Sequence, residues 1–174
     1  MKTLVIVDVQ RDFFHPEGAL YVPGAEELPS KIATVIKDYD RVVLTLDWHP
    51  GDHCSFKEQG GIWPAHCVAY TQGAGLPDCF AIPLAREDVL YYCKGRDKSR
   101  EEYGAFESPS KEILEAFEGA DSIDVCGIVG EYCVMETMKN IASLGFKAKM
   151  RPLKSLIAYF DGGVKFEEFL RTLN

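Results

Sequence analysis

Candidate metal ligands of two kinds, a carboxylate and imidazoles, are concentrated in one stretch, from Asp47 to His53. It places one carboxylate and two imidazoles, those of Asp47, His49 and His53, within seven residues, and a third imidazole follows at His66. Carboxylates and imidazoles together suit a divalent metal such as Zn, Mn or Fe. The spacing is not that of a zinc finger, and a polar turn with scattered histidines is the alternative. Because the stretch directly follows an apolar run, we favour a metal site.

A nucleophile and its partners stand at the ends of other apolar runs. Asp8, Asp47 and Lys94 each follow such a run, and Cys133 comes just after another, where a helix is expected to start. Ligands of an open parallel sheet bind beyond the carboxyl ends of its strands, so we expect these four residues to converge. Taken singly, the thiol could be a buried apolar group, Asp8 a loop cap and Lys94 a solvated amine.

The expected chemistry of this group is nucleophilic catalysis by a thiolate. The positive end of a helix dipole and a nearby Lys94 would both lower the pKa of the Cys133 thiol. Asp8 could take the thiol proton as a general base. Free N–H groups at the same helix start could stabilise an oxyanion.

The elements that must position these residues are strands alternating with helices. Short, β-branched apolar runs predict strands buried on both faces, and helical spacing predicts the segments between them. The fold class is therefore α/β, a three-layer α-β-α arrangement with a mostly parallel sheet of five or six strands. We expect strands over 4–7, 41–46, 89–93, 122–126 and 146–150. We expect helices over 28–39, with Ser30 as a possible cap, 109–118, capped by Ser108, 131–144 and 164–173. Residues 151–163 could form either a sixth strand or a loop.

Composition excludes several classes of function. The 174 residues carry a net charge of −8 without a basic block, which argues against nucleic acid or an anionic membrane as partner. No run is long enough to cross a bilayer, and the apolar start reads as a strand because it lacks a cleavage site. The six cysteines form no C-x-x-C pair, which favours reduced thiols in the cytoplasm. With no linker or repeat, residues 1–174 are expected to form one domain.

Aromatic residues near these candidates suggest a flat substrate. Phe13 follows Asp8, Trp63 precedes His66, and Tyr103 and Phe106 follow Lys94. Planar side chains around a metal and a thiol would suit an aromatic ring. Plain core packing is the alternative, and for Phe106 the two readings have equal weight.

At this point the chain resembles the nicotinamidase/pyrazinamidase branch of the isochorismatase-like cysteine hydrolases. The resemblance runs from Leu4 to about residue 150, and the ordered set of motifs is far more specific than any one of them. The matching segments are D-V-Q-R-D-F (8–13), G-A-L with V-P-G (18–24), D-W-H-P with H-C-S-F (47–56), W-P-A-H-C (63–67), K-G with Y-G-A-F (94–106) and G-I-V-G-E-Y-C-V (127–134).

The resemblance implies roles for individual residues. Asp8, Lys94 and Cys133 would form a catalytic triad, and the backbone N–H groups of Val129 and Cys133 would be the oxyanion donors. A cis peptide bond would join Ile128 to Val129. The other implied roles are metal ligation by Asp47, His49 and His66, ligation or positioning of water by His53, ring stacking by Phe13 and Trp63, and substrate binding by Tyr103. One divalent metal is implied, with Zn preferred and Fe or Mn as alternatives, and so is a homo-oligomer by analogy.

The implied function is hydrolysis of nicotinamide to nicotinate and ammonia through a cysteine thioester, as in NAD salvage. Three features depart from the family: Val129, Gly130 and Glu131 replace a usual A-T-D, Gly104 replaces a usual Ser, and the tail after Arg151 diverges. One alternative is a related cysteine hydrolase of another small amide or carbamoyl compound. Isochorismate hydrolysis is disfavoured by the cysteine. A non-enzyme alternative is a metal-binding or redox-sensing module, which would release no ammonia.

Overall fold

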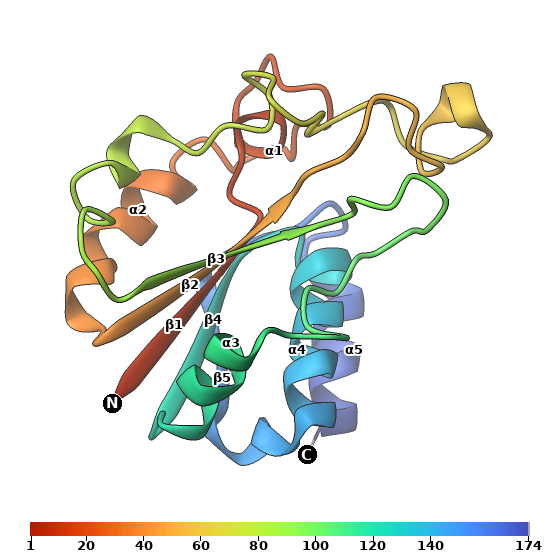
Figure 1. The fold of residues 1–174 in the computed structure, drawn as a ribbon. Coiled ribbons are helices and arrows are strands. Elements are labelled where there is room, and N and C mark those ends of the chain that lie inside the picture. Colours follow the sequence, from red (N-terminus) through yellow and green to blue (C-terminus); the bar gives the residue numbers. More distant parts are fainter. Residues whose placement is uncertain (174) are drawn as a thin grey trace.

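The computed structural model describes residues 1–173 and contains a single five-stranded sheet in which every pairing is parallel. The strand order is β3-β2-β1-β4-β5, so the chain runs outward from β1 in both directions (Figure 1). This arrangement confirms the predicted α/β class. The strands are β1 (Lys2–Val7), β2 (Arg41–Asp47), β3 (Val89–Lys94), β4 (Ser122–Ile128) and β5 (Met150–Ala158).

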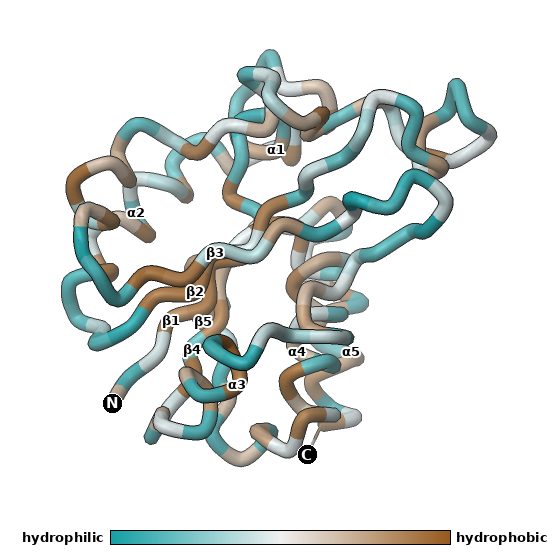
Figure 2. Tube along the Cα trace, in the orientation of Figure 1, coloured by the Kyte–Doolittle hydropathy of each residue, from teal (hydrophilic) through white to brown (hydrophobic). Residues whose placement is uncertain are grey.

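The central strands are apolar because both of their faces are covered. Residues 3–7 of β1 and 42–47 of β2 are all buried. Figure 2 shows these strands as the most hydrophobic part of the trace, with polar residues concentrated in the loops and on the outer sides of the helices. A continuous apolar run is the expected pattern for a parallel strand enclosed in this way.

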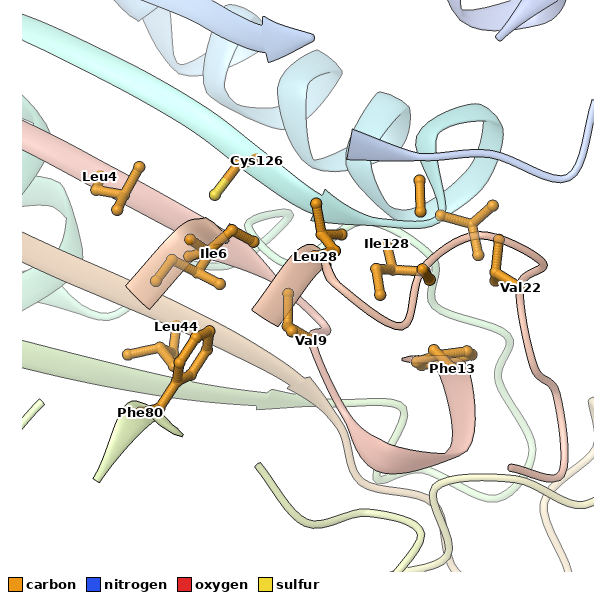
Figure 3. Packing of buried hydrophobic residues seen from close by; sticks show 14 of the residues in the cluster. Leu4, Ile6, Val9, Phe13, Val22, Leu28, Leu44, Phe80, Cys126 and Ile128 are labelled. Carbon is orange, nitrogen blue, oxygen red and sulfur yellow. The ribbon is translucent and has the colours of Figure 1, made fainter. Parts of the chain in front are cut away.

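Helices form a layer on each face of the sheet. Helix α2 (Leu28–Val35) covers one face, and α3 (Lys111–Glu118), α4 (Met135–Ile141) and α5 (Val164–Leu173) cover the other (Figure 1). The short helix α1 (Arg11–Phe14) lies beyond the end of β1 and sends Phe13 into the α2-side core near Val22 and Ile128 (Figure 3). The sheet therefore separates two hydrophobic cores.

The predicted caps of two helices were wrong. Helix α3 begins two residues later than expected, because the Ser110 side chain rather than that of Ser108 accepts a hydrogen bond from the Ile113 N–H. The residue preceding α2 is Glu27, and the Ser30 hydroxyl instead donates to the Glu27 carbonyl within the first turn. Ser and Asp residues compete for several positions near a helix start, so sequence alone sets such boundaries only approximately.

The fifth strand was predicted too early. The segment Ala142–Lys149 continues the preceding helix in irregular turns around Gly145, which has a φ of 93°, and the strand follows as Met150–Ala158. Phe146 lies against Phe117, with ring centroids 5.8 Å apart. Its apolar character therefore reflects packing on α3 and not a strand. Residues 151–158, left undecided between strand and loop, complete this fifth strand.

The predicted nucleophile helix also starts irregularly. Gly130–Val134 forms a π-helical turn after β4, and regular α-helix begins only at Met135. All six cysteines are free. Within residues 1–173, every helix is too short or too polar to cross a membrane.

Candidate active site

The ends of β1, β2 and β3 bring two carboxylates and an amine together. Asp47 and Lys94 are the last residues of β2 and β3 and pair with each other in the sheet register. Asp8 directly follows β1, with a φ of 48°, and its side chain accepts a hydrogen bond of 2.6 Å from the Thr45 hydroxyl. The predicted convergence at the carboxyl edge of the sheet is therefore present.

Lys94 is fully enclosed instead of solvated. Its Nζ lies 3.0 Å from Asp8 Oδ2 and 3.6 Å from Cys133 Sγ, and it donates a hydrogen bond to Asp47 Oδ1. Burial alone would lower the pKa of Lys94, but the two carboxylates raise it well above its ordinary value. The side chain is therefore a fixed ammonium between two acids and a thiol.

Cys133 sits in the π-helical turn that follows β4. Its Sγ lies within 4.8 Å of carboxylate oxygens of both Asp8 and Asp47. Burial raises the pKa of the thiol well above its ordinary value, more than Lys94 lowers it. Lys94 lowers the pKa of the thiol, as expected, but the effect of burial is larger. The neutral thiol is the resting form, so a base is needed.

Asp8 has the properties of that base. Its side chain is completely buried, and burial raises the pKa of its carboxyl while Lys94 opposes the increase. A carboxylate that is poorly solvated holds a proton more readily than an exposed one. The raised pKa makes the ionised Asp8 a stronger base toward the Cys133 thiol than an exposed carboxylate would be.

The Cys133 N–H does not share the hydrogen-bond acceptor of the N–H groups on either side of it. The peptide bond between Ile128 and Val129 is cis, as the resemblance implied. The N–H groups of Tyr132 and Val134 donate to the Val129 carbonyl at 3.1 and 3.0 Å, whereas that of Cys133 between them does not. In this π-helical turn the Cys133 N–H is therefore not used for a bond to the Val129 carbonyl.

Three predicted metal ligands lie beside the thiol. Donor atoms of Asp47, His49 and His66 are mutually within 4.8 Å, and all three side chains are buried. The Nε2 atoms of His49 and His66 lie 3.5 and 3.7 Å from Asp47 Oδ2. Burial would raise the pKa of Asp47, but Lys94 and these two imidazoles lower it well below its usual value.

Hydrogen bonds fix the tautomer of both histidines. Nδ1 of His49 donates to the Gly95 carbonyl at 3.0 Å, and Nδ1 of His66 donates to the Pro64 carbonyl at 2.8 Å. A carbonyl can only accept, so Nδ1 carries the proton in each neutral ring and Nε2 is the nitrogen left to bind a metal. One carboxylate and two such nitrogens in a buried cluster fit a divalent metal.

His53 lies near this cluster but uses both ring nitrogens elsewhere. Its Nε2 donates to the Arg100 carbonyl at 3.0 Å, and its Nδ1 lies 2.7 Å from the Ser55 hydroxyl. The ring packs against His49, with centroids 4.2 Å apart. Burial and the neighbouring His49 lower the pKa of His53, so the ring stays neutral and supports His49 by packing.

The thiol and the possible metal ligands line one small cavity whose walls are largely aromatic. The predicted substrate residues Phe13, Trp63 and Tyr103 all line it, and the Trp63 indole N–H donates to the Tyr103 hydroxyl at 2.9 Å. Phe106 does not reach the cavity, because it is buried in the core beneath α3. For Phe106 the packing alternative is therefore correct.

Several lining residues were not identified from the sequence: Leu20, Glu101, Glu102, Tyr132 and Phe160. Tyr132 could have been found from its position next to the nucleophile candidate. Phe160 lies in the divergent tail, where no motif gave a signal.

Comparisons with known proteins agree with this geometry. Residues 2–150 match the family model of the isochorismatase domain. The chain is 33% identical to the nicotinamidase of Saccharomyces cerevisiae, over 84% of each protein.

Two solved structures share the fold over nearly the whole chain. The yeast nicotinamidase bound to the inhibitor nicotinaldehyde has a TM-score of 0.87 and 29% identity, with 99% of this chain and 95% of that one covered. A pyrazinamidase of Pyrococcus horikoshii in complex with zinc has a TM-score of 0.81 and 31% identity, with 99% and 93% covered.

Proposed function

The chain belongs to the isochorismatase family, and on that premise we propose that it is an amidohydrolase converting nicotinamide to nicotinate and ammonia. The observation that carries this proposal is the position of Cys133, within 4.8 Å of Asp8 and 3.6 Å from Lys94, in the wall of a cavity that Asp47, His49 and His66 also line. A nucleophile and a possible metal site thus face the same small aromatic-lined space. The similarity to the yeast nicotinamidase supports nicotinamide as the substrate.

In the proposed reaction Asp8 takes the proton of the Cys133 thiol, and Sγ attacks the carboxamide carbon. The carbonyl oxygen gains negative charge and is stabilised by the N–H groups of Val129 and Cys133. Asp8 returns the proton to the nitrogen as the C–N bond breaks, and ammonia leaves. A water molecule, deprotonated by Asp8, then cleaves the thioester and releases nicotinate and the thiol.

The Lys94 ammonium stabilises the charges that this proton transfer moves. It faces both Asp8 and Cys133, so it stabilises negative charge on either side of the transfer. It also pairs with Asp47, which connects the nucleophile to the cluster of metal-ligand candidates. We therefore assign Lys94 to electrostatic stabilisation and not to nucleophilic attack.

Asp47, His49 and His66 would hold the divalent ion, with zinc preferred because a zinc complex exists for the similar pyrazinamidase. A metal held by these residues would supply a Lewis acid that could orient the substrate ring. The ring would then lie among Phe13, Trp63 and Tyr103, which line the cavity.

The lining of the cavity favours an aromatic amide. Phe13, Trp63, Tyr103, Tyr132 and Phe160 all line it. Isochorismate is disfavoured as a substrate because the nucleophile candidate is a cysteine. A related hydrolase of a neutral aliphatic amide is the nearest alternative, although the aromatic lining argues against it.

Ammonia release tests the proposal directly. The metal-loaded protein is incubated with nicotinamide, benzamide, isobutyramide and an N-carbamoyl amino acid, each with and without a chelator. We expect nicotinamide to be cleaved fastest, with loss of activity after chelation. Metal binding without ammonia release from any of these compounds would support a metal-binding or redox-sensing module instead.

A further inference from the structure

One wall of the cavity is built by a segment that lies beyond the residues matched by the family model. That match ends at residue 150, whereas Phe160 both lines the cavity and stacks on Trp63, with ring centroids 6.3 Å apart and planes 19° apart. Phe160 is 38% exposed, so its ring is accessible to a molecule that enters the cavity.

The backbone of this wall is attached to the nucleophile turn by one carboxylate. Oε1 of Glu131 accepts hydrogen bonds from the N–H groups of Phe160, at 2.7 Å, and Asp161, at 2.9 Å. Glu131 is only 3% exposed, and its Oε2 has no hydrogen-bond partner among the described residues. A buried carboxylate is costly unless it is hydrogen-bonded, so its contacts with the Phe160 segment are the ones that hold it there.

The neighbouring glycine makes room for the same segment. A Cβ at Gly130 would lie 2.1 Å from Cε1 of the Tyr159 ring, closer than any real contact. Asp161 extends the attachment, because its Oδ1 accepts from the Gly163 and Val164 N–H groups at the start of α5. Gly130 and Glu131, two of the residues that depart from the family pattern, thus both contact the divergent tail.

We propose that Phe160 determines specificity by closing the ring-binding cavity over Trp63, and that Glu131 is a positioning residue that sets Phe160 relative to Cys133. The proposal rests on the function proposed above, since it assigns the closed cavity to the aromatic ring of the amide. Glu131 stands two residues before the thiol in the same π-helical turn. A shift of the Phe160 segment would therefore also move the Cys133 side chain, which faces the substrate carbon.

The test separates ring binding from catalysis. Nicotinamide is titrated by calorimetry into the metal-loaded Cys133→Ala protein, alone and with Phe160→Ala, Glu131→Ala or Glu131→Gln added. Tyr91→Ala is the matched control, because Tyr91 is also an exposed aromatic residue, 54% accessible, but lies on β3 outside the cavity. Ammonia release by the otherwise unchanged protein is measured in parallel, together with KM and kcat for each variant that retains Cys133.

We expect Phe160→Ala and Glu131→Ala to weaken nicotinamide binding and raise KM by about three- to tenfold, with a smaller change in kcat, because one aromatic pair is lost. Glu131→Gln keeps an oxygen that accepts both N–H groups and should bind like the parent, as should Tyr91→Ala. Unchanged affinity in Phe160→Ala, which alters a partly exposed side chain and does not depend on core packing, would overturn the proposal.

Equal losses in the Gln and Ala variants of Glu131 would overturn the positioning role, because the Gln side chain preserves the acceptor. Absence of ammonia release from the unchanged protein, with nicotinamide still bound, overturns the hydrolytic function alone. Failure of the Cys133→Ala parent to bind nicotinamide overturns both.

Discussion

The Nζ atom of Lys94 lies 3.0 Å from Oδ2 of Asp8 in a part of the protein where Asp8 is completely buried and Lys94 is 1% exposed. Asp47 shares the same ammonium. One buried cation thus neutralises the base of the proposed reaction and a candidate metal ligand. Removing this charge would leave two buried carboxylates without compensation.

Lys94→Met should therefore destabilise the protein and abolish ammonia release. Breaking a buried ion pair by removing one partner costs roughly 3–5 kcal/mol. Urea denaturation gives the free energy of unfolding, and Lys98→Met is the control. Lys98 pairs with Asp52 at the surface, with side-chain exposures of 66% and 54%, so its loss should change neither stability nor activity measurably. A stable Lys94→Met protein would contradict this account.

Cys133→Ala should eliminate ammonia release while the fold is kept. Alanine retains the small buried volume near the end of β4, so circular dichroism should match the wild type. Cys79→Ser changes an exposed thiol outside the cavity and should remain fully active. Mass spectrometry of wild-type protein quenched during turnover should detect an acyl adduct on the peptide containing residue 133. Activity in the Cys133→Ala protein would rule out the thioester route.

Metal content should depend on His49 and His66 but not on His53. His49→Ala and His66→Ala each remove a buried imidazole whose Nε2 faces Asp47, and both should lower bound zinc from about one ion per chain to a small fraction. His53→Ala should retain the ion, since both ring nitrogens of His53 already contact Ser55 and Arg100. Elemental analysis after dialysis against a weak chelator measures this. Loss of zinc in His53→Ala would contradict this prediction.

Gly95→Ala should displace His49 and weaken metal binding. A Cβ at Gly95 would lie 2.3 Å from Cε1 of the His49 ring, and Gly95 has a φ of 67°. Gly145→Ala is a matched control, because Gly145 has a φ of 93° with nothing within 4 Å of the added Cβ. Both variants should lose about 1–2 kcal/mol of stability from the left-handed backbone conformation. Only Gly95→Ala should lose zinc; equal zinc content in the two would show that His49 tolerates the added methyl group.

The pH dependence of kcat/KM should show the ionisation of the Asp8 carboxyl. Burial raises the pKa of this carboxyl above its ordinary 3.8, and the base must be ionised, so kcat/KM should fall on the acidic side around an apparent pKa above 3.8. Asp8→Asn should be inactive at every pH.

The same pKa shift predicts the direction in which the free energy of unfolding changes with pH. Because the pKa of Asp8 is raised in the folded state, its contribution to stability is present below the unfolded pKa and is lost as pH rises through the folded pKa. Wild-type stability relative to Asp8→Asn should therefore fall as pH increases through that window. Urea denaturation at several pH values measures this difference, and an increase with pH would refute the assignment.

The sequence alone determined the first four strands and placed Asp8, Asp47 and Lys94 at the ends of three of them. Apolar runs before Asp8, Asp47 and Lys94 predicted buried parallel strands, and the carboxyl-edge rule brought these side chains together correctly. It succeeded because strand periodicity and strand ends are local properties of the chain. The start of β5 was predicted wrongly because Phe146 packs on Phe117, a residue distant in the sequence. The start of α3 was predicted wrongly because Ser108 and Ser110 are equivalent cap candidates by residue type.

Only the tertiary structure decided the protonation and the shape of the site. A cysteine at a helix start beside a lysine suggested a thiolate, but complete burial raises the pKa of Cys133 instead, and burial is a property of the whole fold. The hydrogen bond from His53 to the Arg100 carbonyl joins residues 47 positions apart, and the contact between Glu131 and Phe160 joins residues 29 positions apart. Such contacts are fixed by how the layers pack, and no local pattern in the chain encodes them.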